Sequence, residues 1–118
     1  MIAAMKIAQV RRYALSLPES REEPHFNYSS FRVRGKIFVT VPPDEMHIHV
    51  FVDDAERERA IALHSEFLEK LFWGAKVCGL RISLMKASPS VVINLIRAAW
   101  ARKAPKRLLE TSKKPTDS

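Results

Sequence analysis

The chain has 118 residues, and its 20 Lys and Arg against 13 Asp and Glu give a formal net charge of +7. Hydrophobic residues make up 47% of the sequence and charged residues 28%, proportions that exclude a disordered chain and a collagen-like fibre. This length is that of one domain, which excludes a multidomain enzyme, and the basic charge favours an anionic partner without naming one.

The first element that the pattern predicts is an amphipathic helix over residues 5–17. Apolar residues recur along one of its faces at spacings of three and four: Ile7, Val10, Ala14 and Leu17. Pro18 ends this helix, because proline disfavours helical backbone at the residue before it. Residues 18–30 are polar, and we expect a loop there.

Three short strands are predicted to follow, over residues 31–34, 37–41 and 47–52, because apolar and polar side chains alternate in each. Gly35-Lys36 supplies a turn between the first two strands. Pro42-Pro43-Asp44 separates the second from the third, since proline cannot donate a hydrogen bond to a sheet. Together these segments predict an antiparallel meander.

A second helix is predicted to begin at Asp53 or Asp54, because Asp53 and Glu56 have the spacing of a capping box. A bend at His64-Ser65 would divide it into two short helices. The residues expected on its buried side are Ala60, Leu63, Phe67 and Leu71.

A long strand is predicted over residues 76–85. The last helix begins at Ser88-Pro89, where a capping hydroxyl precedes a proline suited to the first helical position, and Pro105 stops it. Trp73 and Trp100 lie beside apolar stripes and are expected in the core or at its edge. The apolar face of the long strand would carry Cys78, Leu80, Ile82 and Leu84.

These elements predict an α+β fold of one domain in the order α-β-β-β-α-β-α, with the helices mainly on one face of an antiparallel sheet. We expect the domain to span residues 1–109 and residues 110–118 to form a flexible polar tail. The Ile and Val faces of the strands would be buried. The second sheet face would then carry Arg32, Arg34, Phe38, Thr40, His47, His49, Phe51 and Arg81.

Several short motifs are spread along the chain. They are Leu15-Ser16-Leu17-Pro18-Glu19, Pro24-His25-Phe26, Phe31-Arg32-Val33-Arg34-Gly35-Lys36-Ile37-Phe38, Trp73-Gly74, Gly79, and the helix end from Ala98-Ala99-Trp100 to Ala104-Pro105-Lys106-Arg107-Leu108. In these motifs the chain resembles the MmcQ/YjbR-like family, over about residues 5–109. In many relatives a tryptophan directly follows the strand glycine, whereas this chain has Leu80 there.

The resemblance implies a small bacterial α+β domain, with a sheet packed against helices as in frataxin/CyaY or in a double-wing DNA-binding motif. Family members are commonly regarded as DNA-binding proteins, and no catalytic residues come with the family. The likeness to frataxin does not bring iron binding with it, because Lys6, Arg11 and Arg12 stand on the first helix in place of an acidic ridge.

Charge is unevenly distributed along the sequence. Residues 44–69 hold eight acidic and two basic residues, a net charge of −6, whereas residues 70–118 hold eleven basic and two acidic, a net charge of +9. Clustered basic charge attracts phosphates, so we expect a non-enzymatic protein that binds DNA through a basic surface. The alternatives are a module that binds an acidic protein and one that binds a small ligand. The expected phosphate contacts are Arg11, Arg12, Arg32, Arg34, Lys36, Arg81, Lys86, Arg102, Lys103, Lys106 and Arg107.

The predicted second sheet face combines arginines with Phe38, Phe51 and two histidines. Such a face can stack nucleobases and neutralise phosphates, as single-strand-binding sheets do. The alternative is that the 18–30 segment or a partner covers it and that its aromatic rings are simply buried. No RNP-type motif is present, which favours the covered face.

The small-ligand alternative places a pocket beneath the 18–30 segment. Its candidate lining residues are His25, Phe26, Phe38 and His49. His47 and His49 lie on the same side of a strand, but isolated pairs of this kind usually hold no metal, and we expect neither a metal nor a cofactor. No phosphate-binding loop occurs among the three glycines and no nucleophile elbow around the serines, so no catalytic residue is predicted.

The single cysteine, Cys78, cannot form an internal disulfide and is expected to be an inert core thiol, which fits a reducing cytoplasm. No apolar run approaches the ~18 residues of a membrane span, and the segment 1–6 lacks the features of a signal peptide. We therefore expect a cytoplasmic monomer that does not bind membranes.

Overall fold

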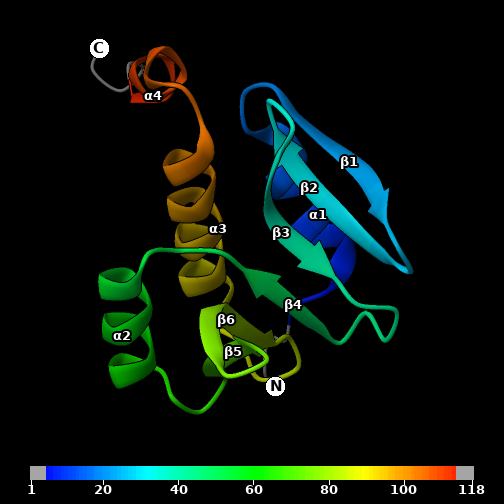
Figure 1. The fold of residues 1–118 in the computed structure, drawn as a ribbon, viewed down its shortest axis with the longest axis vertical. Helices are drawn as coiled ribbons and strands as arrows, with labels where there is room; N and C mark the ends of the chain where they lie inside the picture. Colours follow the sequence, from blue (N-terminus) through cyan, green and yellow to red (C-terminus); the bar gives the residue numbers. More distant parts are fainter. Residues whose placement is uncertain (1–4, 114–118) are drawn as a thin grey trace.

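The computed structural model describes the backbone of residues 5–113 and the side chains of residues 5–109. Within this range the chain forms four helices and six strands, and the strands build one antiparallel sheet in the order β1-β2-β3-β4-β6-β5 (Figure 1). The elements in chain order are α1 (Ile7–Ser16), β1 (Ser20–His25), β2 (Tyr28–Val33), β3 (Lys36–Val41), β4 (His47–Val50), α2 (Asp54–Leu63), β5 (Leu68–Trp73), β6 (Lys76–Ser83), α3 (Pro89–Lys103) and α4 (Lys106–Lys113).

The main layers are the sheet and the two helices α1 and α3, which pack on one of its faces. Figure 1 shows α1 behind β1 to β3 and α3 alongside them, and α2 packs against β5 and β6 at the other end of the sheet. Trp100 of α3 is fully buried between these layers, and its indole N–H donates a hydrogen bond of 3.1 Å to the carbonyl of Pro18. The sheet face turned away from α1 and α3 is called the outer face below.

The predicted α+β fold class is confirmed, and so are the helix before Pro18, the three strands between residues 31 and 52, and the helix that begins at Pro89. Asp53 caps α2 as predicted, because its carboxylate accepts a hydrogen bond from the backbone N–H of Glu56. The cap predicted at Ser88 is wrong: its hydroxyl makes no capping bond and lies 3.3 Å from the hydroxyl of Ser90.

The prediction of a loop over residues 18–30 is wrong, because Ser20–His25 form strand β1 at the edge of the sheet. This strand is polar on both faces. Glu22 faces α1 and pairs with Arg11, whereas Glu23 lies opposite Ser30 on the outer face. Pro24 is tolerated because an edge strand leaves one row of N–H groups without a ladder partner. Without apolar alternation, the segment carried no sequence signal for a strand.

The prediction that the second helix continues beyond His64 is also wrong. Helix α2 ends at Leu63, whose side chain is 67% exposed, and residues 68–73 form β5 instead. This strand pairs with β6 from Leu68 to Trp73, and Gly74 turns the hairpin with a φ of 63°. The chain order is therefore α-β-β-β-β-α-β-β-α-α.

Helical structure continues beyond Pro105 as α4, which runs to Lys113. The buried side chain of Leu108 anchors this short helix. The predicted tail thus begins inside α4, and its residues 114–118 lie outside the described part of the chain.

Two irregularities in the strand pairing move side chains to the face opposite to the predicted one. Phe31 pairs with Val39 but Arg32 pairs with Ile37, which leaves Phe38 as the extra residue of a bulge. Its ring is fully buried in the core, so its predicted place on the second sheet face is wrong. Cys78 is the extra residue of the second bulge, in β6, and it lines a cavity on the outer face instead of lying in the core stripe.

Across residues 5–113, none of the helices is long and apolar enough to span a membrane.

Candidate functional site

A row of polar residues crosses the outer face from β2 to β5. The strand register places Ser30 opposite Thr40, Thr40 opposite His49, His49 opposite Arg81, and Arg81 opposite Glu69. Residues opposite one another in an antiparallel pair share a sheet face. Thr40, His49 and Arg81 were predicted to share this face, and the register confirms it.

His49 is held in one protonation state by its neighbours. Its Nε2 lies 3.1 Å from a guanidinium nitrogen of Arg81, which can only donate, so Nε2 accepts and the ring proton is on Nδ1. That proton points to the hydroxyl of Thr40, 3.4 Å away. The pKa of His49 is lowered to about 4, mainly by burial and further by the positive charges of Arg81 and His47. The imidazole is therefore neutral at pH 7.

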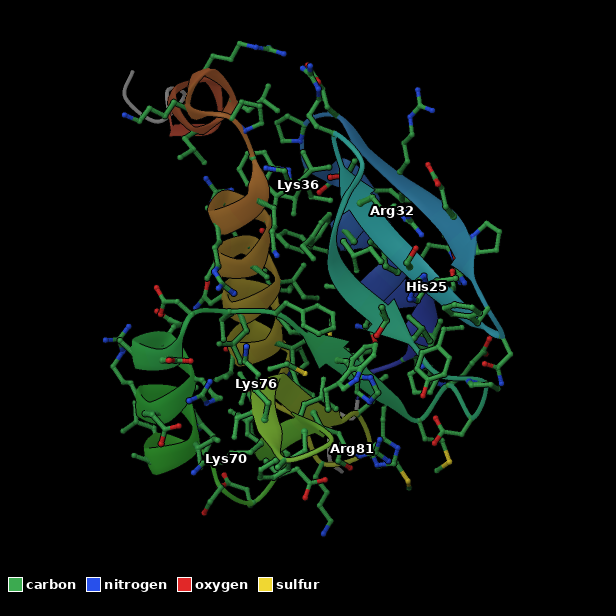
Figure 2. All side chains as sticks on the ribbon, in the orientation of Figure 1. His25, Arg32, Lys36, Lys70, Lys76 and Arg81 are labelled. Carbon is green, nitrogen blue, oxygen red and sulfur yellow. The ribbon has the colours of Figure 1, made fainter. Side chains whose placement is uncertain are left out.

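Above His49 lies a cavity of about 340 Å³, called the aromatic cavity below. Its walls are the tips of two hairpins, β1–β2 and β5–β6, and its floor is formed by the outer face of the sheet. Figure 2 shows His25 at the tip of the first hairpin. Within the described part of the chain, no Asp, Glu, Lys or Arg contributes to the lining. The lining residues are His25, Phe26, Asn27, Tyr28, Thr40, His49, Phe51, Leu71, Phe72, Trp73 and Cys78.

Three aromatic side chains at the rim of this cavity are exposed to solvent. The exposed fraction is 91% for Phe26, 79% for Trp73 and 56% for Phe72. Trp73 is thus far from the core position predicted for it, whereas the prediction for Trp100 is confirmed.

Of the four residues predicted to line a pocket, the structure brings His25, Phe26 and His49 together in the aromatic cavity. Phe38 is in the core instead. The contribution of the β5–β6 hairpin, with Phe72 and Trp73, was missed because this segment was predicted to be helical. The turn dipeptide Trp73-Gly74 was the available signal for it.

Basic residues from three separate segments meet at the other end of β3. They come from the β2–β3 turn, the end of α3 and the start of α4, and Figure 2 shows Lys36 beside the end of α3. Burial lowers the pKa of Lys103, and the positive charges of Arg102 and Lys36 lower it further. We call this group the basic cluster: Arg34, Lys36, Arg102, Lys103, Lys106 and Arg107.

An acidic side chain, Glu19, bridges two segments of the basic cluster. One of its carboxylate oxygens lies 3.3 Å from Arg34 and the other 3.2 Å from Arg107. By contrast, Lys36 and Lys106 are exposed and make no ion pair with any side chain in residues 5–109. The cluster therefore keeps an excess of positive charge among these side chains.

The other five predicted phosphate contacts lie elsewhere. Arg11 pairs with Glu22 at 2.8 Å, which raises its pKa through the hydrogen bond and lowers that of Glu22. Arg32 and Arg81 lie on the outer face, paired with Glu23 at 3.7 Å and Glu69 at 3.3 Å. The remaining two, on α1 and in the loop after β6, are Arg12 and Lys86.

His47 and His49, the pair considered as a metal site, each interact with another side chain. A ring nitrogen of His47 lies 3.1 Å from the carboxylate of Asp44, and His49 faces the guanidinium of Arg81. In the described part of the chain, no three His, Cys, Asp or Glu side chains gather in a way that could hold a metal ion.

Comparison with known proteins identifies relatives of this fold. The sequence model of the YjbR family matches residues 15–102. Among solved structures, the crystal structure of the Deinococcus radiodurans protein DR2400, with a DUF419 domain, superposes with a TM-score of 0.70. The identity is 18%, and the match covers 97% of this chain and 84% of the other. None of the curated proteins matches the chain.

Proposed function

The chain belongs to the YjbR family, and from its structure we propose that it is a non-enzymatic protein that binds DNA by gripping phosphates with the basic cluster. A phosphate backbone offers closely spaced negative charges, and lysine and arginine side chains neutralise them with release of counterions. Contacts of this kind position a nucleic acid without reading its sequence. The proposal requires one copy of the chain, because all six basic residues come from it.

The observation that carries the proposal is that Lys36 lies beside the end of α3, which carries Arg102 and Lys103 (Figure 2). Like charges held together repel one another, so such a cluster costs stability in the absence of a counterion. The depressed pKa of Lys103 reflects its burial and this repulsion, and a bound phosphate would relieve the repulsion. The pair Lys36 and Lys106 adds charge that no described acid neutralises.

The test is a salt titration of binding to a labelled single-stranded DNA oligonucleotide, followed by fluorescence anisotropy. The double variant Lys36→Gln, Lys106→Gln removes two exposed charges from the basic cluster. If each contacts one phosphate, the slope of log K against log salt becomes shallower by about 1.4, since each contact contributes about 0.7.

The matched control is the double variant Lys6→Gln, Lys70→Gln, which removes two exposed lysines outside the basic cluster. It is expected to keep the slope of the wild type. Equal slopes for the two double variants would contradict the proposal, because net charge alone would then explain binding. If the oligonucleotide does not bind, and an acidic protein binds through the basic cluster instead, DNA binding is excluded. The basic cluster is then a protein-docking surface.

A further inference from the structure

The aromatic cavity has the chemistry of a site for a flat, uncharged ring. Its rim carries Phe26, Phe72 and Trp73, whose faces can stack on a planar ligand. Its volume of about 340 Å³ is at the small end of ligand pockets, which are roughly 300–1,000 Å³. The described lining holds no Asp, Glu, Lys or Arg to balance a charge on a ligand within the cavity.

The floor of the cavity offers polar atoms for the edge of such a ring. The Nδ1–H of His49 donates to the hydroxyl oxygen of Thr40. The hydroxyl proton of Thr40 is therefore free to be donated to another group. Within residues 5–109 no acceptor for it is found. Asn27, at the tip of the first hairpin, adds both an amide donor and an amide acceptor. A ring that bears carbonyl and N–H groups on its edge can use both side chains.

The rim residue Phe26 is held in an unfavourable backbone conformation. Its φ is 60°, in the left-handed region that favours glycine, and its ring is 91% exposed. Among the described residues, the one aromatic ring that it contacts is that of the neighbouring His25. The two rings meet edge-on, with 4.8 Å between their centroids. A two-residue hairpin turn favours a positive φ at its first residue, so the β1–β2 turn holds this ring at the open rim of the cavity.

The aromatic cavity adjoins the basic cluster. The ring of Phe51 lines the cavity, while its main-chain carbonyl accepts a hydrogen bond of 3.2 Å from Arg102. Lys36 and Thr40 are four residues apart on β3, a span of about 13 Å along an extended strand. A nucleic-acid strand whose phosphates lie on the basic cluster therefore has its bases within reach of the cavity.

We propose that the aromatic cavity holds an unpaired nucleobase of a single-stranded nucleic acid, stacked between the two hairpin tips. A base inside a duplex has both faces covered by its neighbours, so only an unpaired base can enter. The proposal rests on the proposed function for the strand that carries the base. Recognition of the base itself rests on the cavity.

The two tryptophans make the test direct. Trp73 is 79% exposed at the rim and Trp100 is fully buried, so their two indole N–H signals in a ¹H–¹⁵N NMR spectrum report separately. The protein is titrated with a thymidine oligonucleotide, with an abasic strand of the same length, and with free thymidine. The base-bearing strand is expected to shift the signal of Trp73 and not that of Trp100. It is also expected to bind about tenfold more tightly than the abasic strand, because one stacked base is worth about 1.4 kcal/mol.

Variants at the rim complete the test, since Trp73 is exposed and its removal leaves the core intact. Trp73→Ala should abolish the preference for the base-bearing strand. Leu63→Ala, which removes an exposed apolar side chain from α2, should keep it. If both strands bind equally with a salt-dependent affinity and the Trp73 signal does not move, this inference is overturned while the proposed function stands.

If neither strand binds, the proposed function fails and the free nucleoside decides the inference. A shift of the Trp73 signal by thymidine then supports base recognition by the cavity. An unchanged Trp73 signal overturns it.

Discussion

The guanidinium of Arg102 donates a hydrogen bond of 3.2 Å to the main-chain carbonyl of Phe51. Arg102 belongs to the basic cluster, and the ring of Phe51 lines the aromatic cavity. This contact joins the end of α3 to the segment after β4, and so it fixes a charged surface beside an uncharged one. Phosphates and bases have the same contrast, since a nucleotide carries its charge on the backbone and not on the ring.

Glu19 is predicted to weaken nucleic-acid binding, because its carboxylate pairs with Arg34 and Arg107 of the basic cluster. Glu19→Gln removes this competing charge, and we expect the affinity for single-stranded DNA to rise about threefold to tenfold at low salt. Fluorescence anisotropy measures the change. Glu66→Gln removes an exposed carboxylate from the segment between α2 and β5, outside the basic cluster, and serves as the control. Equal effects of the two substitutions would show that Glu19 acts only through net charge.

Phe26→Gly is predicted to stabilise the protein and to weaken its binding. Glycine adopts the φ of 60° found here without strain, so the free energy of unfolding should rise by about 1 kcal/mol. Urea denaturation measures this change. The same substitution removes an aromatic wall of the cavity, so affinity for a base-bearing strand should fall. A variant that is both less stable and unchanged in binding would argue against a functional role for this strained residue.

The stability of the protein is predicted to fall between pH 7 and pH 5 because of His49. Its pKa is about 4 in the folded state, against 6.5 when unperturbed, because burial disfavours the charged ring. The unfolded chain therefore binds the proton more readily over this range, and the free energy of unfolding decreases as the pH falls. From the two pKa values the loss is about 2 kcal/mol between pH 7 and pH 5.

Two measurements check this. Urea denaturation at the two pH values gives the loss, and an NMR titration of the His49 ring gives its pKa directly. The carboxylates of Glu22 and Asp44 contribute little to the change in stability between pH 7 and pH 5. Hydrogen bonds lower their pKa values below 4.5 and 3.8, so the stability they contribute is lost only in more acidic solution. A His49 ring that titrates near 6.5 would contradict the prediction.

Gly79→Ala is predicted to destabilise the fold and to disturb the cavity. A Cβ at Gly79 would lie 2.8 Å from the carbonyl oxygen of Val50 and 3.1 Å from a ring carbon of Phe51. Because the first of these atoms belongs to the backbone, β4 or β6 must shift, at a cost of about 1–3 kcal/mol. Thermal denaturation measures the cost. Gly74→Asn is the control, since open space surrounds that residue and asparagine tolerates its positive φ. Equal stability of both variants would contradict the close approach at Gly79.

The helices and central strands could be predicted from the sequence because each has an apolar face of the right period. Strand β1 could not, since Glu22 and Glu23 face opposite sides of an edge strand and both are polar. Strand β5 was missed because Phe67 and Leu71 also have a helical spacing from Ala60, and only pairing with β6 decides between the two structures.

The candidate site was predicted in part. His25, Phe26 and His49 do lie together, because strand alternation places His49 on the outer face beside the first hairpin. Phe38 and Cys78 were assigned to the wrong faces for one reason. Each is the extra residue of a bulge, and one extra residue reverses the alternation that the sequence pattern assumes. The basic cluster depends on how α3, α4 and the β2–β3 turn are placed in space, which sequence spacing does not encode.

The most direct test of the central claim compares the affinity of the protein for a single-stranded oligonucleotide and for the same sequence as a duplex, at one salt concentration. The wild type is predicted to prefer the single strand by about tenfold, the value of one stacked base. Trp73→Ala is predicted to lose this preference and to keep its affinity for the duplex, which needs only the basic cluster. An undiminished preference in Trp73→Ala, or a wild type that binds the duplex more tightly, would contradict the account.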